Sequence, residues 1–135
     1  MTSANIPPMP DMKLEVVPLP VADVDRAKAF YAEQIGFHVD HDVRPSDSVR
    51  VVQLTPPGSA CSVVIGTGLG LAQTPPGSVK GLHLVVASVQ QVRDILAARG
   101  VAVSDIVDMG GIKYVFFEDP DGNSWALQEI PPGRR

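Results

Sequence analysis

Two short segments of this sequence occur twice, at nearly the same spacing. Val21-Ala22-Asp23-Val24 is matched by Val86-Ala87-Ser88-Val89 at an offset of 65 residues. The turn-forming segment Thr55-Pro56-Pro57-Gly58 is matched by Asp119-Pro120-Asp121-Gly122 at an offset of 64 residues. Two matches at nearly the same offset indicate a duplicated structural unit. The duplication restricts the fold, because both copies must contain the same elements in the same order.

The first copy shows the pattern of a strand, a helix and three further strands. Asp23 is placed to cap a helix over residues 24–34, in which apolar residues recur at helical spacing, and Gly36 follows as its end. The expected strands lie at 13–21, 37–43, 50–54 and 60–66. On the strand 37–43 we expect Val39 and Val43 on one face and Asp40 and Asp42 on the other.

The second copy repeats this order. Ser88 is placed to cap a helix over residues 89–99, and Gly100 ends it. The expected strands lie at 81–86, 101–107, 113–118 and 123–130. A four-stranded unit with one helix buries only one face well, so two copies are expected to pack around a shared cleft.

The predicted fold is therefore α+β. Two tandem βαβββ modules form an open, mixed β-sheet that encloses a cleft and carries its helices on the outside. At 135 residues the chain makes one domain of ordinary size. We expect five segments: a flexible N-terminal tail at 1–12, the first module at 13–67, a Gly- and Pro-rich linker at 68–80, the second module at 81–130, and a C-terminal tail at 131–135.

Charge and composition exclude several partners. The formal net charge is −4 and no basic block is present, which argues against nucleic acid. No run of 18 apolar residues predicts a membrane span, and the first residues lack the pattern of a secretory signal. The single cysteine, Cys61, is predicted to fill core space and fits a reducing cytoplasm.

Two motifs then suggest a family. The stretch LPVADVDRAKAFYAEQIGF (19–37) and the later EDPDGNSWAL (118–127), together with the duplicated βαβββ order, resemble the vicinal oxygen chelate superfamily, which includes glyoxalases and bleomycin-resistance proteins. The resemblance covers roughly residues 13–130. It implies a fold rather than one reaction. It also implies a homodimer, which is common in the family.

Metal-dependent members of this family hold a divalent ion with one His, Gln or Glu from each of four strands. Counting from the family motifs places these positions at Val16, Ser62, Gly81 and Ala126. Such side chains cannot hold a divalent cation together. The resemblance therefore implies a protein without the family's metal site, and we expect no metal and no other cofactor. The DPDG segment is predicted to be only a turn, with Glu118, Asp119 and Glu129 solvated.

Strand alternation then predicts which side chains face the cleft. The expected ligand-binding residues are mostly small and apolar, with a few polar groups between them: Val16, Pro18, Ser62, Val64, His83, Val85, Ser124, Ala126 and Gln128. Such a surface suits a largely apolar organic ligand that a few hydrogen bonds orient. His83 is the candidate catalytic base, because imidazole titrates near neutrality; the alternative is a histidine that only packs or is solvated.

Other features are interpreted as structural. His38 and His41, three residues apart on a strand, are expected on opposite faces and therefore not as a metal pair. The glycine-rich segment 66–70 precedes no helix and is expected to be a connector rather than a phosphate loop. Phe30 and Tyr31 are expected in the core or an interface, and Trp125 is expected in the core, with stacking on a ligand as the alternative.

Three functions remain open at this point. The first is a dimeric binding protein that sequesters an apolar metabolite or antibiotic without a metal ion. The second is a metal-free isomerase or lyase, in which His83 moves a proton on a carbonyl substrate while Ser62 or Gln128 stabilises the oxyanion. The third is a structural or regulatory module with a vestigial cleft.

Overall fold

The computed structural model describes residues 6–71 and 73–133. Its elements follow the chain in the order β1 (Val16–Pro18), α1 (Val24–Ala29), η2 (Phe30–Ile35), β2 (His38–Ser46), β3 (Val49–Thr55), β4 (Ser62–Thr67), β5 (Leu82–Val85), α2 (Val89–Ala98), β6 (Val107–Met109), β7 (Ile112–Glu118) and β8 (Ser124–Glu129). This order confirms the α+β class and the two βαβββ modules.

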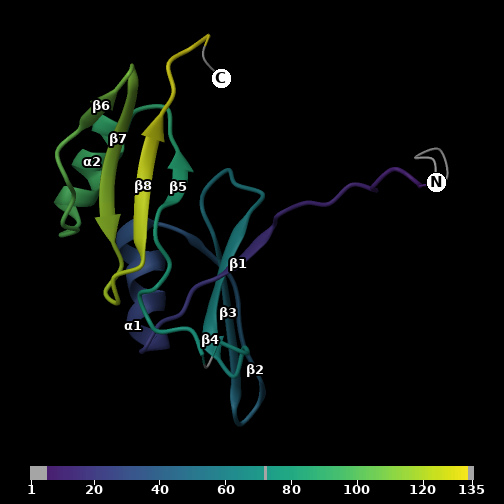
Figure 1. Ribbon diagram of the computed structural model, residues 1–135. Coiled ribbons are helices and arrows are strands. Elements are labelled where there is room, and N and C mark those ends of the chain that lie inside the picture. The colour runs from purple at the N-terminus through teal and green to yellow at the C-terminus, as the bar shows by residue number, and fades with distance from the viewer. Residues whose placement is uncertain (1–5, 72, 134–135) are drawn as a thin grey trace.

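The strands form two mixed four-stranded sheets with matching topology (Figure 1). The first sheet has the order β1-β4-β3-β2 and the second has the order β5-β8-β7-β6. In each sheet the first strand of the module pairs in parallel with the last, and the remaining pairs are antiparallel. The described segments include no helix with the length and apolar composition needed to cross a membrane.

Both predicted helix caps are present. The Asp23 carboxylate accepts the backbone N–H of Arg26 at 3.0 Å, and the Ser88 hydroxyl accepts that of Gln91 at 3.1 Å. The first helix continues from α1 into the π-helical segment η2, which buries the adjacent Phe30 and Tyr31, and it ends at Gly36 in the left-handed conformation with φ of 91°.

One hydrophobic core serves both modules. Val52, Leu54, Val63 and Ile65 come from one side of the first sheet, and Val115, Phe117, Trp125 and Leu127 come from one side of the second. The aromatic side chains of the first helix lie between them: Phe30 contacts Phe117, and Tyr31 contacts Trp125. Because these sides of the two sheets share the core, the opposite sides are outer faces of the chain.

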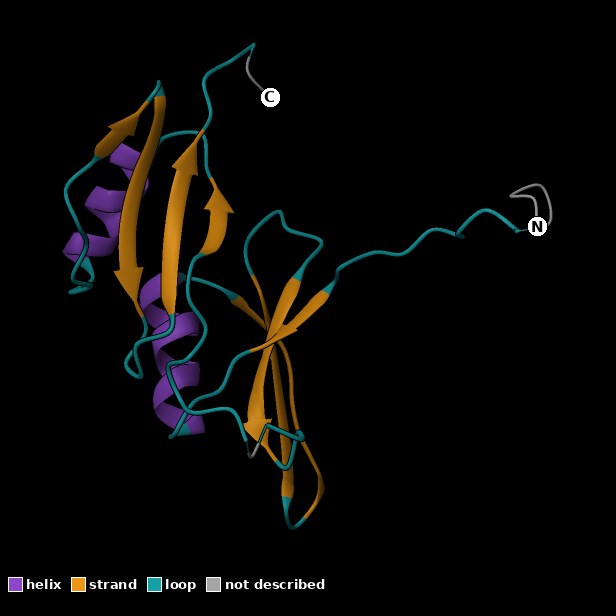
Figure 2. Ribbon diagram, viewed as in Figure 1, coloured by secondary structure: helices purple, strands orange, loops and turns teal. Residues whose placement is uncertain are grey.

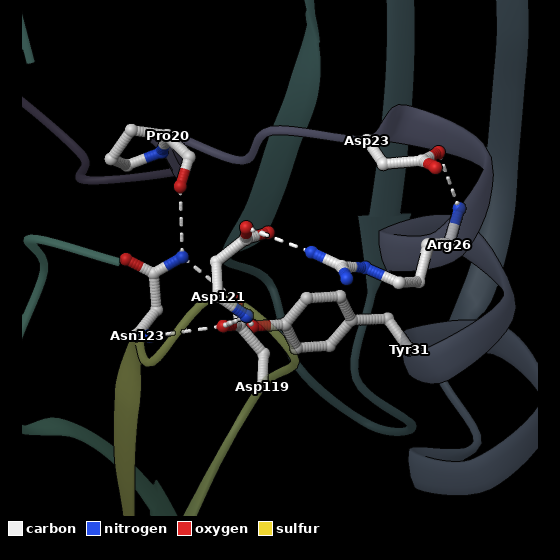
Figure 3. A network of polar contacts seen from close by, with 7 residues as sticks. All are labelled: Pro20, Asp23, Arg26, Tyr31, Asp119, Asp121 and Asn123. Carbon is white, nitrogen blue, oxygen red and sulfur yellow. Dashed lines mark hydrogen bonds and ion pairs between the residues drawn. The ribbon is translucent and has the colours of Figure 1, made fainter. Parts of the chain in front are cut away.

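The turn after β7 contradicts the prediction that Asp119 is solvated. Asp119 is only 5% exposed. Its carboxylate accepts the Tyr31 hydroxyl at 2.7 Å, the Asn123 side-chain amide at 2.8 Å and two backbone N–H groups, of Asp121 and Asn123, at 2.9 Å each (Figure 3). The Tyr31 hydroxyl in turn accepts the Trp125 indole N–H at 2.9 Å. The acid therefore joins the first helix to the second module.

The equivalent turn of the first module, Thr55-Pro56-Pro57-Gly58, carries no such acid. The residue equivalent to Tyr31 in the second helix is Leu96, which is buried and lines a pocket of about 400 Å³ with Pro56 and Pro57. A leucine has no hydroxyl, and the turn beside this pocket carries Thr55 where the other turn carries Asp119. Glu129 is also structural rather than solvated, because its carboxylate accepts the N–H of Val89 at the start of α2. Glu118 is exposed, as predicted.

A bulge in β2 overturns the predicted faces of that strand. The pairing with β3 shifts between Val39 and His41, so one extra residue enters the strand and reverses the alternation beyond it. Val43 is consequently 45% exposed. Asp42 turns toward the helix, where it pairs with Arg50 and Lys28 at 2.8 Å each.

The same bulge corrects the argument about His38 and His41. His38 pairs with Thr55 and His41 pairs with Gln53, so the two histidines lie on the same face of the sheet. Both are exposed, and His38 contacts Asp40 at 3.0 Å through Nδ1.

The predicted strand 101–107 is largely irregular, and β6 begins only at Val107. Ser104 makes the one β-like contact of this stretch: its N–H donates to the Phe116 carbonyl, and its hydroxyl accepts the Phe116 N–H at 2.8 Å. The Ser104 carbonyl accepts the Arg93 guanidinium instead of a strand partner. Side chains therefore replace the backbone ladder that alternation alone predicted.

Residues 6–15 form an arm without helix or strand that runs away from the body of the chain (Figure 2). It carries apolar side chains that are 60 to 78% exposed: Ile6, Met9, Met12 and Leu14. Residues 1–5 of the predicted N-terminal tail and residues 134–135 of the C-terminal tail lie outside the described residues.

Candidate ligand site

The residues predicted to bind a ligand lie on the outer faces of the two sheets. Ser62 and Val64 point to the outer face of β4, and the register of the parallel pair places Val16 and Pro18 beside them on β1. On the second sheet, His83 and Val85 lie on β5 beside Ala126 and Gln128 of β8. The exposure of these residues differs widely: Val16 is 47% exposed, whereas Ala126 is 2% exposed.

The strand register corrects one position that residue counting assigned. Val16 pairs with Ser62 in the first module, and His83 pairs with Ala126 in the second. The residue equivalent to Val16 is therefore His83 and not Gly81. The connection between strand and helix explains the error, because three residues lie between Leu19 and the Asp23 cap and only one lies between the equivalent Val86 and the Ser88 cap.

A pocket of about 880 Å³ lies on the outer side of the second sheet and extends to the segment 102–104. It brings together three of the predicted residues, His83, Ser124 and Ala126. Val85 lines the separate 400 Å³ pocket instead. Phe116, which is 40% exposed, also lines the large pocket and was missed because no face was assigned to the strand 113–118. Alternation from the buried Phe117 identifies it.

A smaller cavity, of about 100 Å³, lies where the two modules meet. Ser62 from the first module and His83 from the second both line it, together with Leu82 and Leu84. His83 also lines the 880 Å³ pocket, so this histidine connects the small cavity with the large one.

Contacts on the second sheet orient His83. Its Nδ1 lies 2.7 Å from the carbonyl oxygen of Gly81. Its ring meets the ring of Tyr114 edge-on, with centroids 6.1 Å apart. The rings of Tyr114 and Phe116 are parallel within 4°, and the Gln128 side-chain amide donates to the Tyr114 hydroxyl at 3.3 Å. These groups form a half-exposed surface with aromatic rings and a few polar atoms.

A chain of hydrogen bonds crosses the outer face of the first sheet. Ser62 Oγ lies 2.6 Å from Thr55 Oγ1, and the Thr55 hydroxyl donates to the Asp40 carboxylate. Gln53 donates to the same carboxylate at 3.2 Å. The hydrogen bond from Thr55, followed by that from His38, lowers the pKa of Asp40 to about 2, so this carboxyl is ionised at neutral pH. Asp40, Gln53 and Thr55 were not predicted as site residues.

The side chains at the family's metal positions do not fit a divalent ion. With the corrected register these positions hold Val16, Ser62, His83 and Ala126, of which only His83 has a ligand atom that divalent ions favour. No group of three His, Cys, Asp or Glu side chains within residues 6–71 and 73–133 is arranged to bind a metal.

The comparisons with known proteins agree with this architecture. The family model described as "Glyoxalase/Bleomycin resistance protein/Dioxygenase superfamily" matches residues 13–127. The chain belongs to this superfamily, whose fold is that of the vicinal oxygen chelate proteins. A search of curated proteins found no significant match.

Several solved structures share the fold. The antibiotic-binding protein TnmS3 from Streptomyces sp. CB03234 is 32% identical, with a TM-score of 0.82 over 91% of this chain and 99% of that chain. A glyoxalase/bleomycin resistance protein from the same organism is 34% identical, with a TM-score of 0.74 over 85% and 98% of the two chains. A member of the superfamily from Sphaerobacter thermophilus DSM 20745 is 27% identical, with a TM-score of 0.78 over 89% and 98%.

Proposed function

We propose that this protein binds a small, largely apolar organic molecule, a metabolite or an antibiotic, without a metal ion. The observation that carries the proposal is the 880 Å³ pocket on the outer side of the second sheet, which lies in the size range of small-molecule sites. Its lining combines Phe116, Trp125 and Ala126 with the polar His83 and Ser124. The resemblance to TnmS3, which is described as antibiotic-binding, supports the same ligand class.

Two of the four family positions carry no ligand atom and a third carries only a weak one, which supports metal independence. Valine and alanine offer no donor, and the Ser62 hydroxyl is a weak ligand for a divalent ion. We propose that Val16, Pro18, Ser62, Val64, Val85, Ser124, Ala126 and Gln128 contact the ligand together with His83. The unpaired Cys61 is consistent with a reducing cytoplasm as the site of action.

We also propose that the protein acts as a homodimer. The predicted ligand faces are outer faces of the single chain, and each is open on the side away from the core. A second copy would close these faces and cover the exposed apolar arm at residues 6–14. The test is the mass in solution by light scattering, and a monomer at micromolar concentration would contradict this part of the proposal.

A thermal-shift screen of metabolites and antibiotics, run with and without a chelator, tests the function. A ligand that binds only the folded state raises Tm in a saturable way. We expect such a rise for at least one apolar compound, unchanged by chelator. A large loss of stability with chelator alone would contradict metal independence, and a library without any saturable shift would contradict ligand binding.

The alternative is a metal-free isomerase or lyase that uses His83 as its base. The contact of Nδ1 with the Gly81 carbonyl favours this candidate, because it holds the ring and leaves Nε2 as the nitrogen that can accept a proton. In an enzyme, His83→Ala abolishes turnover of a bound carbonyl compound while binding persists. In a sequestering protein no turnover exists, and the same substitution changes only the affinity.

A further inference from the structure

The hydrogen bonds around Ser62 determine the direction in which its hydroxyl proton points. The Asp40 carboxylate is ionised and can only accept hydrogen bonds. The Thr55 hydroxyl, which has one proton, donates that proton to Asp40. In its 2.6 Å contact with Ser62, Thr55 must therefore be the acceptor and Ser62 the donor. Ser62 has no second proton, so toward a ligand it offers only its lone pair.

The His83 imidazole, like the Ser62 hydroxyl, is a hydrogen-bond acceptor toward a ligand. The Gly81 carbonyl can only accept, so the His83 nitrogen that lies 2.7 Å from it, Nδ1, carries the proton. In the neutral imidazole the other nitrogen, Nε2, is then a hydrogen-bond acceptor. Ser62 and His83 both line the 100 Å³ cavity between the modules. Two residues from different modules, each with an acceptor lone pair, thus line one small space.

We infer that this cavity selects ligands with a hydroxyl or N–H donor, and that Asp40 and Thr55 are positioning residues that create this selectivity. The inference rests on the proposed binding function and specifies the ligand class. A cavity of about 100 Å³ accommodates a substituent of a few heavy atoms, since one water occupies roughly 30 Å³ in the liquid. The apolar body of the ligand then lies in the 880 Å³ pocket, which His83 also lines.

A ligand with only an acceptor at this place, such as an ether, meets the lone pairs of Ser62 and His83 and leaves both unpaired. Leaving buried polar groups unpaired on binding opposes affinity. The outer-face Tyr114 provides the contrast: its hydroxyl accepts from Gln128, and its own proton has no acceptor among the described residues. A carbonyl elsewhere on the ligand can therefore be recognised by Tyr114 while the donor enters the cavity.

The first test needs no ligand. Nitrogen-15 NMR of the histidine side chains at pH 8 distinguishes the two neutral tautomers, and His83→Gln assigns the signal. We expect the proton on Nδ1. A proton on Nε2 would make His83 a donor and would overturn the inference.

The second test uses the matched probes 2-naphthol and 2-methoxynaphthalene, which differ in one hydroxyl proton. We expect the naphthol to bind at least about tenfold more tightly, as one lost hydrogen bond corresponds to roughly a factor of ten. Thr55→Val removes the acceptor of the Ser62 proton, so the hydroxyl becomes a donor and the preference shrinks or reverses. Thr55→Ser restores the wild-type preference, and the control Thr67→Val, at the exposed end of β4, leaves it unchanged.

The outcomes separate this inference from the proposed function. Equal binding of both probes to the wild-type protein, or an unchanged preference in Thr55→Val, would contradict the selectivity and leave ligand binding intact. Failure of the naphthol and of every library compound to bind would contradict the proposed function, and the selectivity would fall with it. A preference that disappears in Thr55→Val and returns in Thr55→Ser would support the inference, because a purely structural role would not change the ranking of two probes.

Discussion

Replacing Tyr31 with Phe tests the contact that joins the two modules. The substitution keeps the ring and removes only the hydroxyl, which donates to Asp119 and accepts from the Trp125 indole. Both partners are at most 5% exposed, so water cannot replace the lost group. The ring contacts of Tyr31 with Phe37 and Trp125 remain. The decrease in stability therefore reports the loss of these two hydrogen bonds and not the opening of a cavity.

The magnitude follows from what each partner loses. The Trp125 N–H keeps no acceptor, and an unpaired buried donor costs about 1–3 kcal/mol. Asp119 keeps its three other donors, from Asn123 and the backbone of Asp121 and Asn123, so its loss is that of one hydrogen bond to a charged group, about 1–2 kcal/mol. Together we expect a decrease of about 2–5 kcal/mol in the free energy of unfolding, and a fall in Tm of roughly 8–20 °C for a domain of this size.

The assay is urea denaturation of Tyr31→Phe, with Trp125 fluorescence as the probe. Tyr114→Phe is the matched control, because its hydroxyl makes a single 3.3 Å contact on the half-exposed outer face. We expect the control to lose less than about 1 kcal/mol. A decrease below 1 kcal/mol for Tyr31→Phe, or an equal effect in the two variants, would refute the view that Asp119 has a structural role at the junction.

Two further predictions concern pH and charge. Burial, followed by the hydrogen bond to Asp119, raises the pKa of Tyr31 above its ordinary value. The contribution of this tyrosine to stability is therefore full below about pH 10 and is lost as the pH rises further. Tm should fall more steeply between pH 10 and 11 for the wild type than for Tyr31→Phe. Hydrogen bonds from Arg50 and then Lys28 lower the pKa of Asp42; its contribution is present above about pH 4 and is lost as the pH falls. Asp42→Asn should therefore reduce the free energy of unfolding by about 1–3 kcal/mol at pH 7 and flatten the acid side of the plot of stability against pH. The control Asp47→Asn, at an exposed position, should do neither. A plot for Asp42→Asn that runs parallel to that of the wild type would count against the ion pair.

The fold could be predicted from the sequence because its signals are local and repeated. Asp23 and Ser88 cap their helices through contacts three residues away, and Gly36 ends the first helix through its own backbone conformation. The duplication then required the second module to repeat the first. None of these inferences depends on contacts between the modules.

The errors have a different origin, because each depends on a partner that is distant in the sequence. One extra residue in β2 reversed the faces of Asp42 and Val43, and a bulge is defined by the pairing of two strands rather than by the residues of one. The strand expected at 101–107 fails because Arg93 and the hydroxyl of Ser104 take the hydrogen bonds of its ladder. Asp119 is buried because of Tyr31, which lies 88 residues earlier in the chain.

The site was the least predictable part, for the same reason. Counting residues from the helix cap assumed that both modules have the same connection, and it assigned Gly81 where the strand pairing assigns His83. That shift changes the chemistry considered for the site. If Gly81 is one of the four positions, their side chains contain no nitrogen. If His83 takes its place, they contain one imidazole in addition to the Ser62 hydroxyl. One imidazole is too little for a divalent ion, but together with Ser62 it is enough to recognise a hydrogen-bond donor, which is the property that the two naphthalene probes measure.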